Sequence, residues 1–391
     1  MTQSGDRLFT PRFFLMCGFT FTVFLSAFQL LPTAPFRILS LGGSEFVAGL
    51  FLGFLTYASA FSAPFTGALA DRFGKRRVLL IASIAIAGFS TAYAFISSVP
   101  LMLSLVIVHG VFWSGLLTAS GAYLADIIPP HRRGEGIGYY GFSTLLAIAL
   151  APSIGLFLFK FGWATVCLSA GALNVAMAVI AWCMRESHHG AAHDGPLFGA
   201  HVFEWRVAVA SITLFLYSFG YGGVTSFVAL YATANRVTPG LFFTVFAIAT
   251  MCTRPISGRL GDRLGHVRVF IPCLALIVIG YALLAIGGTR PWLLASAVIF
   301  GVGFGSAYPM YAAYVLQHVD TRRRGAAFGG ILAAFDTGIG TGSIAMGWLV
   351  HRYGFRSAYA TAACLAALSI PYFLLSGRRL LWTTSISERP A

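Results

Sequence analysis

The chain contains one stretch twice: residues 64–74 read PFTGALADRFG, and residues 255–265 read PISGRLGDRLG, 191 positions later. A second pair shares this offset, because Arg132-Arg133-Gly134 corresponds to Arg323-Arg324-Gly325. Two separate motifs with one common offset indicate that the halves of the chain are copies of one structural unit. The fold therefore has to be explained as one unit that occurs twice.

The composition around these motifs is that of an integral membrane protein. Hydrophobic residues make up 58% of the 391 residues and charged residues 10%, whereas soluble domains carry about 25% charged residues. Apolar stretches long enough to cross a ~30 Å hydrocarbon core recur along the chain, and the alternating pattern of an outer-membrane barrel is absent. Division by twelve leaves about 32 residues for each spanning helix and its loop.

We expect an all-α membrane protein with twelve transmembrane helices, six in each copy. The expected helices are 12–35, 45–69, 77–96, 99–127, 135–159 and 161–183 in the first copy, and 205–232, 238–259, 266–287, 291–316, 325–350 and 355–376 in the second. Because six is even, both copies have the same orientation, as in transporters built from parallel repeats. The predicted domains are a first bundle, 1–184, a cytoplasmic linker, 185–204, and a second bundle with a short cytoplasmic tail, 205–391.

The net charge of +14 could indicate a nucleic-acid partner, but its distribution indicates membrane topology instead. We place the loops on alternating sides of the membrane, starting from a cytoplasmic N-terminus. Of the 26 basic residues, 20 then fall on the inner side, including Arg254, and 6 fall on the outer side. The outer residues are Arg37, Lys160, Arg236, Arg290, Arg352 and Arg356. By the positive-inside rule, both termini are expected in the cytoplasm. We predict a multi-pass protein of the inner or plasma membrane that contacts lipids and binds no nucleic acid.

Neither cysteines nor histidines form a convincing metal motif. The six cysteines are scattered through apolar segments without CxxC spacing and are expected to be small buried residues. The linker carries His188, His189, His193, Asp194 and His201. We interpret it as a solvated linker, with metal binding as the alternative. We expect no metal and no cofactor.

The repeated stretch resembles a family signature. Gly67-x-x-x-Asp71-Arg72-x-Gly74-Lys75-Arg76 is similar to the loop between helices 2 and 3 of the major facilitator superfamily. The second copy is degenerate, with His266 and Val267 where basic residues are usual. The likeness extends to helix count, orientation and repeat. It implies a monomeric secondary transporter of the proton antiporter-like branch that works by alternating access.

The resemblance implies a gating role for this loop. In the family, the aspartate at the position of Asp71 latches the cytoplasmic side to the start of helix 11, here Arg324-Gly325-Ala326. An acid at the inner end of helix 4 joins that charge network. The implied gating residues are Gly67, Asp71, Arg72, Gly74, Lys75, Arg76, Asp126, Gly258, Asp262, Arg263 and Arg324. From the residues alone, the alternative is a topology-setting basic turn whose glycines permit unusual dihedral angles.

Two further segments bear on the direction of transport and its coupling. Residues 151–155, Ala-Pro-Ser-Ile-Gly, resemble the Gly-Pro-x-x-Gly-Gly motif of exporters, although Ala151 and Leu156 replace glycines. Export is therefore favoured over import, with ordinary helix packing as the alternative. In helix 4, Val106 stands where many proton-coupled exporters carry an arginine, and His109 is the nearest ionisable residue.

In the family's fold, helices 1, 4, 7 and 10 surround a central cavity. Each of them carries polar or aromatic residues one helical turn apart. The predicted cavity residues, besides His109, are Gln29, Thr33, Trp113, Tyr217, Tyr221, Tyr308 and Tyr311. An aromatic cavity with few charges suits a small amphipathic or apolar substrate; helix–helix packing is the alternative.

Asp336 is the predicted proton-coupling residue. It lies eleven residues beyond Gly325, about 16 Å along a helix, whereas the other acidic residues lie in loops, tails or near helix ends. Acids at this depth usually mark ion or proton pathways. His109 is the second titrating candidate. The alternative is that Asp336 only hydrogen-bonds a neighbouring helix that Gly338 and Gly340 allow to approach.

The absence of certain sequence motifs argues against some energy sources and some classes of protein. No GxxxxGK[ST] nucleotide-binding loop and no GxSxG or HExxH motif occurs, so neither ATP-driven transport nor a hydrolase is supported. We predict proton-coupled export of a small amphipathic organic molecule, and no enzymatic activity. A metabolite importer or facilitator of the same fold is one alternative. A membrane receptor or scaffold without transport activity is the other.

Overall fold

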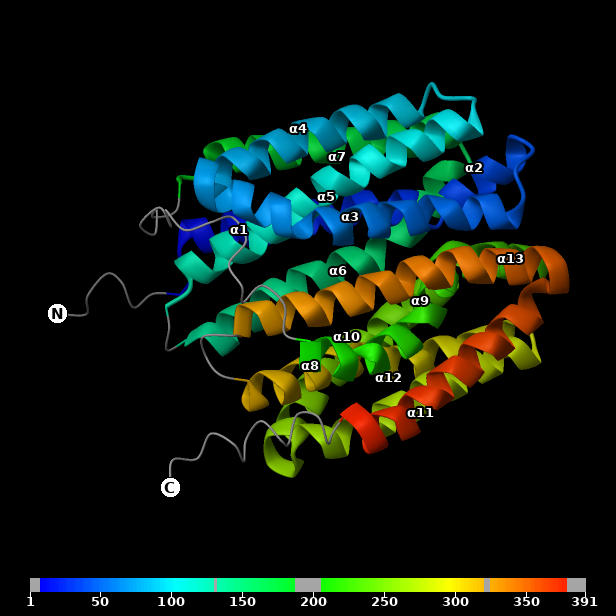
Figure 1. Cartoon of the computed structure of the whole chain (residues 1–391). Coiled ribbons are helices and arrows are strands. Elements are labelled where there is room, and N and C mark those ends of the chain that lie inside the picture. Colours follow the sequence, from blue (N-terminus) through cyan, green and yellow to red (C-terminus); the bar gives the residue numbers. More distant parts are fainter. Residues whose placement is uncertain (1–7, 130–131, 187–204, 320–323, 378–391) are drawn as a thin grey trace. The chain divides into compact units, whose positions relative to one another are not determined.

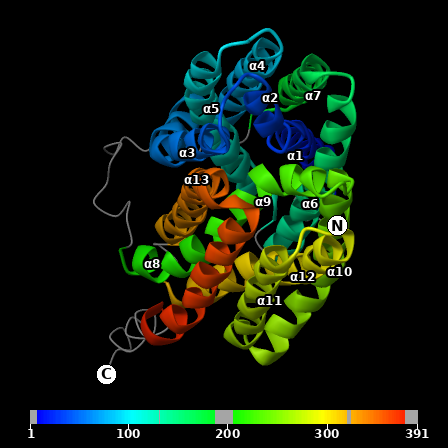
Figure 2. The same ribbon diagram turned by 90° about the vertical axis from the view of Figure 1, so that its right-hand side faces the viewer.

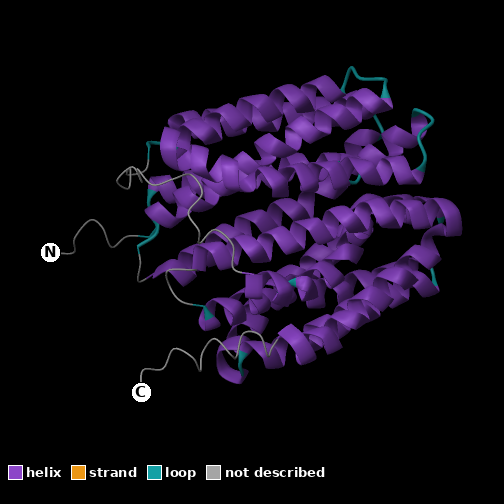
Figure 3. Ribbon diagram, viewed as in Figure 1, coloured by secondary structure: helices purple, strands orange, loops and turns teal. Residues whose placement is uncertain are grey.

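The computed structural model describes residues 8–129, 132–186, 205–319 and 324–377. These residues form helices joined by short turns, and no β-strand occurs among them (Figures 1 and 3). The α-helices are α1 Pro11–Leu30, α2 Ala34–Ser40, α3 Glu45–Phe73, α4 Lys75–Tyr93, α5 Val99–Ile127, α6 Arg133–Phe159, α7 Trp163–Cys183, α8 Trp205–Ala210, α9 Ile212–Ala234, α10 Pro239–Leu264, α11 His266–Ile286, α12 Arg290–His318 and α13 Arg324–Tyr372. A π-helical turn, Phe373–Gly377, follows α13.

The last long helix consists of two membrane crossings. The 49 residues of α13 would extend about 73 Å as one straight helix, more than twice the hydrocarbon thickness. At Gly354 the backbone leaves helical geometry, with φ 82° and ψ 170°. Eleven stretches of the described chain are long and apolar enough to cross a membrane, and α13 supplies only one of them in this count. Dividing it at Gly354 gives twelve crossings, and the predicted twelve-helix fold is confirmed.

The helix boundaries repeat at the offset found in the sequence. Both ends of α5 and α12 differ by 191 positions, and so do the first residues of α4 and α11. The turns that precede α4 and α11 share one conformation, because Gly74 has φ 97° and Gly265 has φ 92°. Side chains other than glycine are strained at such φ values. The duplicated sequence therefore encodes a duplicated backbone.

Several helix boundaries differ from those predicted. The signature residues were expected in loops after positions 69 and 259, but α3 continues to Phe73 and α10 to Leu264. Charged residues such as Asp71 and Arg72 are tolerated in an exposed last turn, and each helix ends only at the glycine with positive φ. The expected first helix is interrupted between α1 and α2, where Pro32 and Pro35 flank the break.

The helices group into two compact units. Unit 1 comprises residues 1–41 and 57–197, and unit 2 comprises residues 42–56 and 198–391. In unit 1, α4 packs against α5 and α7, and α1 packs against α6 and α7 (Figure 2). In unit 2, α9 packs along α13, and α12 contacts both α10 and α11. Most of the predicted linker, 187–204, lies outside the described residues, so the predicted domain limits stay a prediction.

The first part of α3 packs against α13 within unit 2. The Ser343 hydroxyl donates to the Gly49 carbonyl at 2.9 Å, and His351 Nδ1 lies 2.9 Å from a Glu45 carboxylate oxygen. Glycine makes this contact possible, since a Cβ on Gly347 would lie 2.6 Å from the Glu45 carbonyl. Close approach through small residues is the usual way in which helices associate in membranes.

Glycine also brings α9 and α13 together. A Cβ on Gly338 would lie 2.8 Å from the Phe215 carbonyl. One turn earlier, the Ser218 hydroxyl donates to the Phe335 carbonyl at 3.0 Å. These contacts fix the position of the turn of α13 that carries Phe335 and Asp336.

Candidate functional sites

The signature loop of unit 1 is a tight turn around Gly74. The Gly74 N–H donates to the Ala70 carbonyl at 3.1 Å, and the Gly74 carbonyl accepts from the Val78 N–H at 3.2 Å. Because Gly74 belongs to both hydrogen-bonded turns, α4 begins directly after α3 ends. Gly67, by contrast, lies inside α3 without an unusual dihedral angle. The unusual geometry expected of this loop is therefore at Gly74.

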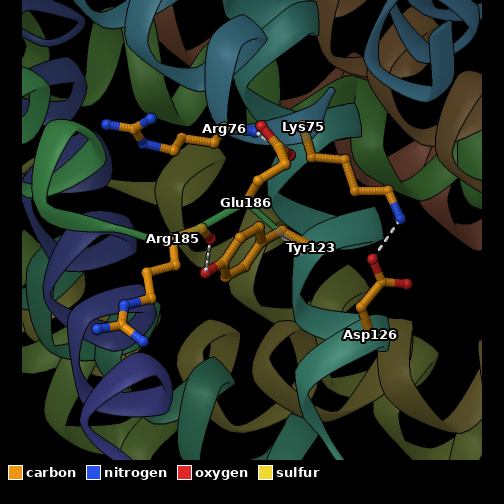
Figure 4. Close-up of polar contacts among 6 residues, drawn as sticks. All are labelled: Lys75, Arg76, Tyr123, Asp126, Arg185 and Glu186. Atoms are coloured by element: carbon orange, nitrogen blue, oxygen red, sulfur yellow. Dashed lines mark hydrogen bonds and ion pairs between the residues drawn. The ribbon is translucent and has the colours of Figure 1, made fainter. Parts of the chain in front are cut away.

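An ion pair joins the start of α4 to the end of α5. Lys75 Nζ lies 2.5 Å from Asp126 Oδ2, with side chains that are 16% and 29% exposed (Figure 4). Asp126, which was predicted to join the charge network of the loop, thus contacts Lys75. Partly exposed pairs of this kind contribute about 1 kcal/mol or less to stability.

Arg76 and Glu186 connect α4 to the residues that follow α7. The Arg76 N–H donates to Glu186 Oε1 at 3.1 Å, which supplies a carboxylate to the N-terminus of a helix that lacks its own side-chain cap. The Arg76 guanidinium donates through Nη2 to the Trp182 carbonyl at 2.7 Å. Figure 4 shows the contact of Glu186 with Arg76. Each of these two residues thus satisfies a backbone group at the end of the other helix.

Tyr123 adds a third connection at this end of unit 1. Its hydroxyl donates to the Arg185 carbonyl at 2.8 Å (Figure 4). Arg185 and Glu186 open the predicted linker, so the first linker residues are held by α4 and α5. Sequence reasoning missed Glu186, because an acid in a polar segment carries no signal of its own.

The other signature residues are exposed. Asp71 and Arg72 lie in the last turn of α3, and Asp262 and Arg263 lie in the last turn of α10. Among the described residues, Asp71 forms no ion pair. The side chain of Arg324, its expected partner, is outside the described part of the chain. The latch therefore remains a prediction, as does the role of Gly258 inside α10.

The polar residues of α1 form contacts inside unit 1. Gln29 Oε1 accepts from the Ser169 hydroxyl at 3.1 Å, and the Thr33 hydroxyl donates to the Gln29 carbonyl at 2.7 Å. Both residues are buried. A Cβ on Gly155, in the exporter-like segment of α6, would lie 2.6 Å from the same Gln29 carbonyl. These groups hold α1, α6 and α7 together.

His109 faces α4. Its Nδ1 lies 3.3 Å from the Tyr93 hydroxyl, and its ring is stacked on Phe89 with centroids 5.7 Å apart. The side chain is 6% exposed. Trp113, one turn further along α5, instead packs edge-to-face on Phe24 of α1 at 5.8 Å. The two residues that were predicted to share a cavity-lining face thus contact different helices.

Unit 2 contains an aromatic cluster, which we define by seven residues. They are Tyr217, Tyr221, Phe246, Phe300, Phe304, Tyr308 and Phe335. Its closest pair is Tyr221 and Phe304, stacked at 4.2 Å, and Tyr308 contacts Phe335 at 5.0 Å. Tyr221, Phe304, Tyr308 and Phe335 are partly exposed, whereas Tyr217 is fully buried. The structure thus brings together three of the four predicted tyrosines, and the partly exposed members offer an apolar surface.

The remaining tyrosine, Tyr311, lies elsewhere in unit 2. It is fully buried, its hydroxyl lies 3.2 Å from that of Ser211, and its ring lies 5.5 Å from Phe270. Tyr217 differs from it, because the Tyr217 hydroxyl is buried with no hydrogen-bond partner among the described residues.

Asp336 directly follows the Phe335 of the aromatic cluster. The residue is partly exposed. Its carboxylate forms no hydrogen bond or ion pair with the described residues. The interhelical hydrogen bond of this turn is made by the Phe335 carbonyl with Ser218 instead. The hydrogen bond that the purely structural alternative requires is therefore not formed with the described residues, and both interpretations of Asp336 stay predictions.

Sequence reasoning also missed Arg254. The sequence places it among the basic residues of the inner side. In the structure it lies inside α10, and its Nε donates to the Gly305 carbonyl of α12 at 3.0 Å. The repeat contains a signal that could have revealed it, since the residue 191 positions earlier is Ala63. A charge gained in one copy of a transmembrane helix needs an explanation.

Possible metal ligands do not gather in the described part of the chain, where no group of three or more His, Cys, Asp or Glu residues could hold an ion. The histidines of the predicted linker, His188, His189, His193 and His201, lie outside the described residues together with Asp194. Metal binding by the linker therefore stays an open alternative.

Comparisons with known proteins agree with the fold. The family model described as Major Facilitator Superfamily matches residues 15–239 and 210–389. The multi-drug resistance efflux pump PmrA of Streptococcus pneumoniae is 25% identical over 368 residues, which cover 90% of this chain and 92% of the pump. The uncharacterized MFS-type transporter YhhS of Escherichia coli is 25% identical over 361 residues, 90% of this chain and 86% of YhhS.

Solved structures show the same architecture at lower identity. A POT family transporter in complex with 5-aminolevulinic acid superimposes with a TM-score of 0.79 at 12% identity, covering 94% of this chain and 96% of the other. The human organic anion transporter MFSD10 gives a TM-score of 0.69 at 17% identity, covering 93% and 100%. These relatives and neighbours are transporters, not enzymes.

Proposed function

Because the chain belongs to the major facilitator superfamily, we propose that it is a proton-coupled secondary transporter that exports a small amphipathic organic molecule by alternating access. The observation that carries this proposal is Asp336. A carboxyl group lies within the membrane-spanning part of unit 2, beside the aromatic cluster and without a hydrogen-bond partner among the described residues.

The coupling step requires only a change of environment at Asp336. A carboxyl group that alternates between a hydrated and a dry environment gains and loses a proton. Alternating access supplies such a change, because the site is exposed first to one side of the membrane and then to the other. Asp336 directly follows Phe335, whose ring lies 5.0 Å from that of Tyr308, so a change of charge at Asp336 occurs beside partly exposed members of the aromatic cluster. His109 is the second candidate, although its contacts are with Tyr93 and Phe89.

The aromatic cluster supports an amphipathic substrate. Its partly exposed members supply flat apolar area and phenol hydroxyls, which suit a molecule that has an apolar body and few polar groups. Tyr221 and Tyr308 are the members best placed to contact such a molecule. Gln29, Thr33 and Tyr311 are engaged in contacts within their units.

Two observations favour export. One relative is named as a multi-drug efflux pump. In α6, Pro152 lies inside the helix and Gly155 packs on the backbone of α1, as the exporter-like segment requires if it is a bending point. We propose location in the cell membrane with both termini in the cytoplasm, on the basis of the 20-to-6 distribution of basic residues. The signature loop, with its Lys75–Asp126 pair, then lies at the cytoplasmic end.

Transport assays on the purified chain in proteoliposomes test this proposal. We expect that an imposed pH gradient makes members of a panel of fluorescent amphipathic compounds accumulate on one side of the proteoliposome membrane. Asp336→Asn, which keeps the shape but cannot ionise, is expected to abolish this accumulation while exchange of the same compound persists. Glu135→Gln, at an exposed acid in the first turn of α6, is the matched control and should behave like the parent.

The outcomes separate the parts of the proposal. Uphill accumulation by Asp336→Asn at the parental rate would exclude Asp336 as the coupling residue. If the compound accumulates only on the side of the membrane that carries the two termini, the protein is an importer. Equilibration without accumulation under every gradient would indicate a facilitator.

A further inference from the structure

Arg254 places a cation at mid-depth in unit 2. Its backbone lies ten residues before the end of α10, about 15 Å along the helix. The carbonyl that accepts from its Nε belongs to Gly305, fifteen residues after the start of α12 and thirteen before its end. The guanidinium group therefore lies level with the middle of α12, where an uncompensated charge is costly.

Nothing in the described part of the chain neutralises this charge. No carboxylate of the described residues pairs with Arg254, and Asp336, the other intramembrane charge considered above, forms no ion pair with it. A guanidinium group has five N–H donors, of which the bond to Gly305 uses one. The residue is partly exposed, and the remaining donors form no hydrogen bond with the described residues.

Helix packing alone does not require an arginine here. One turn earlier on α10, the Thr250 hydroxyl donates to the Gly301 carbonyl at 3.0 Å, which already joins α10 to α12. In unit 1, the residues equivalent to Arg254 and Gly305 are Ala63 and Ser114. There a neutral contact between the Thr66 and Ser114 hydroxyls, 3.0 Å apart, connects the corresponding helices. The same helix pair is thus held without a charge in the other copy.

Arg254 also lies on the stripe of α10 that leads to the aromatic cluster. Phe246, Thr250 and Arg254 follow at intervals of four residues, which places them on one side of the helix. Phe246 contacts Phe300 at 5.4 Å and Phe304 at 6.3 Å. A cation and an apolar aromatic surface are therefore presented along one helix pair.

We propose that Arg254 binds the anionic group of the transported molecule, so that the preferred substrates are amphipathic carboxylates whose apolar part contacts the aromatic cluster. The guanidinium group can bind a carboxylate with two parallel hydrogen bonds. This inference narrows the substrate class within the proposed function and does not depend on the direction of transport or on proton coupling.

Binding measurements on the purified full-length chain in detergent test the proposal. The probes are a series of ω-phenyl carboxylates of increasing chain length, together with the methyl ester and the amine of the same carbon skeleton. We expect the best carboxylate to bind the parent at least about 10-fold more tightly than its ester, as is typical of a hydrogen bond to a charged group. Calorimetry gives each dissociation constant directly.

Three variants separate charge from packing. Arg254→Gln should remove the preference for the carboxylate while affinity for the ester stays unchanged. Arg254→Lys, which keeps the charge but not the planar fork, should retain part of the preference. Arg259→Gln, at an exposed arginine of the same helix, is the control and should keep the full preference. Melting temperatures show whether each variant is folded.

The proposal is overturned if the parent binds ester and carboxylate equally or binds no carboxylate of the series. It is also overturned if folded Arg254→Gln keeps the preference, or if Arg254→Lys loses it as completely as Arg254→Gln. These outcomes are independent of the test of Asp336. A selective Arg254 site in a protein without proton-driven accumulation would refute the coupling mechanism and leave the anion site in place.

Discussion

At the scale of single residues, the hydroxyls of Tyr217 and Tyr281 have opposite surroundings. Both side chains are fully buried in unit 2. The Tyr281 hydroxyl donates to the Tyr217 carbonyl at 3.0 Å, whereas the Tyr217 hydroxyl has no partner among the described residues. A buried polar group without a partner destabilises the folded state, and a satisfied one stabilises it by about 1 kcal/mol.

Replacing each tyrosine by phenylalanine should therefore have opposite effects. Tyr281→Phe is expected to lower the melting temperature, because the change removes a hydrogen bond and costs about 1 kcal/mol. Tyr217→Phe is expected to leave the melting temperature unchanged or to raise it. Thermal unfolding of both variants in one detergent provides the comparison. A lower melting temperature for Tyr217→Phe alone would show that its hydroxyl is bonded, for example to an internal water.

The sequence singled out Asp336 and not Arg254 because the two residues lie at different distances from the ends of their predicted helices. An acid eleven residues inside a helix stands out against an apolar background. Arg254 lies only five residues before the predicted end of its helix at position 259, and an arginine so placed is usually read as a side chain that extends to the membrane surface. Whether it does so depends on its rotamer and on the groove formed with α12, and neither is encoded in local sequence. Glu186 was missed likewise, because its partner, the N-terminus of α4, is more than a hundred positions away.

At the scale of helices, the two signature turns offer an internal comparison. Gly74 and Gly265 have nearly the same positive φ, but their surroundings differ. A Cβ on Gly74 would lie 2.8 Å from a Glu186 carboxylate oxygen, whereas a Cβ on Gly265 would have nothing within 4 Å. Only the first turn is therefore closely packed against another segment.

Alanine at both positions should separate strain from packing. Gly265→Ala is expected to cost about 1–2 kcal/mol, the strain of a left-handed backbone with a Cβ. Gly74→Ala should cost more, because Glu186 must also move and the cap of α4 is weakened. The difference should appear in hydrogen exchange as faster exchange in the first turn of α4 than in that of α11. Equal exchange in the two turns would show that the Glu186 contact contributes nothing.

Most helices could be predicted from the sequence because their apolar stretches match the membrane thickness. The bounds of α5 agree with the prediction at both ends, and those of α11 and α12 agree within two residues. The ends of α3 and α10 did not follow hydropathy, because a helix can continue past the apolar part until a glycine with positive φ stops it. Contacts between helices, such as those of His109, depend on rotation about the helix axis, which a polar pattern defines poorly.

At the scale of the whole molecule, orientation in the membrane is the prediction that the basic residues make. Both termini are expected in the cytoplasm, because an even number of crossings separates them and the basic loops lie on their side. A green fluorescent protein fused after Ala391 should therefore fluoresce in Escherichia coli, and alkaline phosphatase at the same place should be inactive. The reverse pattern would invert the orientation. The same fusions after Gly42, in the first outer loop, are the control and should give the opposite result.

The arginine of α10 has a consequence for biosynthesis. During translation, α10 leaves the ribosome before its hydrogen-bonding partner α12, so the insertion machinery receives a segment whose charge has no acceptor yet. Insertion measurements put an arginine near a helix centre at about 2.5–3.5 kcal/mol, and no equivalent charge exists in the corresponding segment of unit 1. The two copies therefore differ in the cost of inserting this segment. We expect the second copy to depend more strongly on α12 for stable insertion of α10 than the first copy depends on α5 for α3.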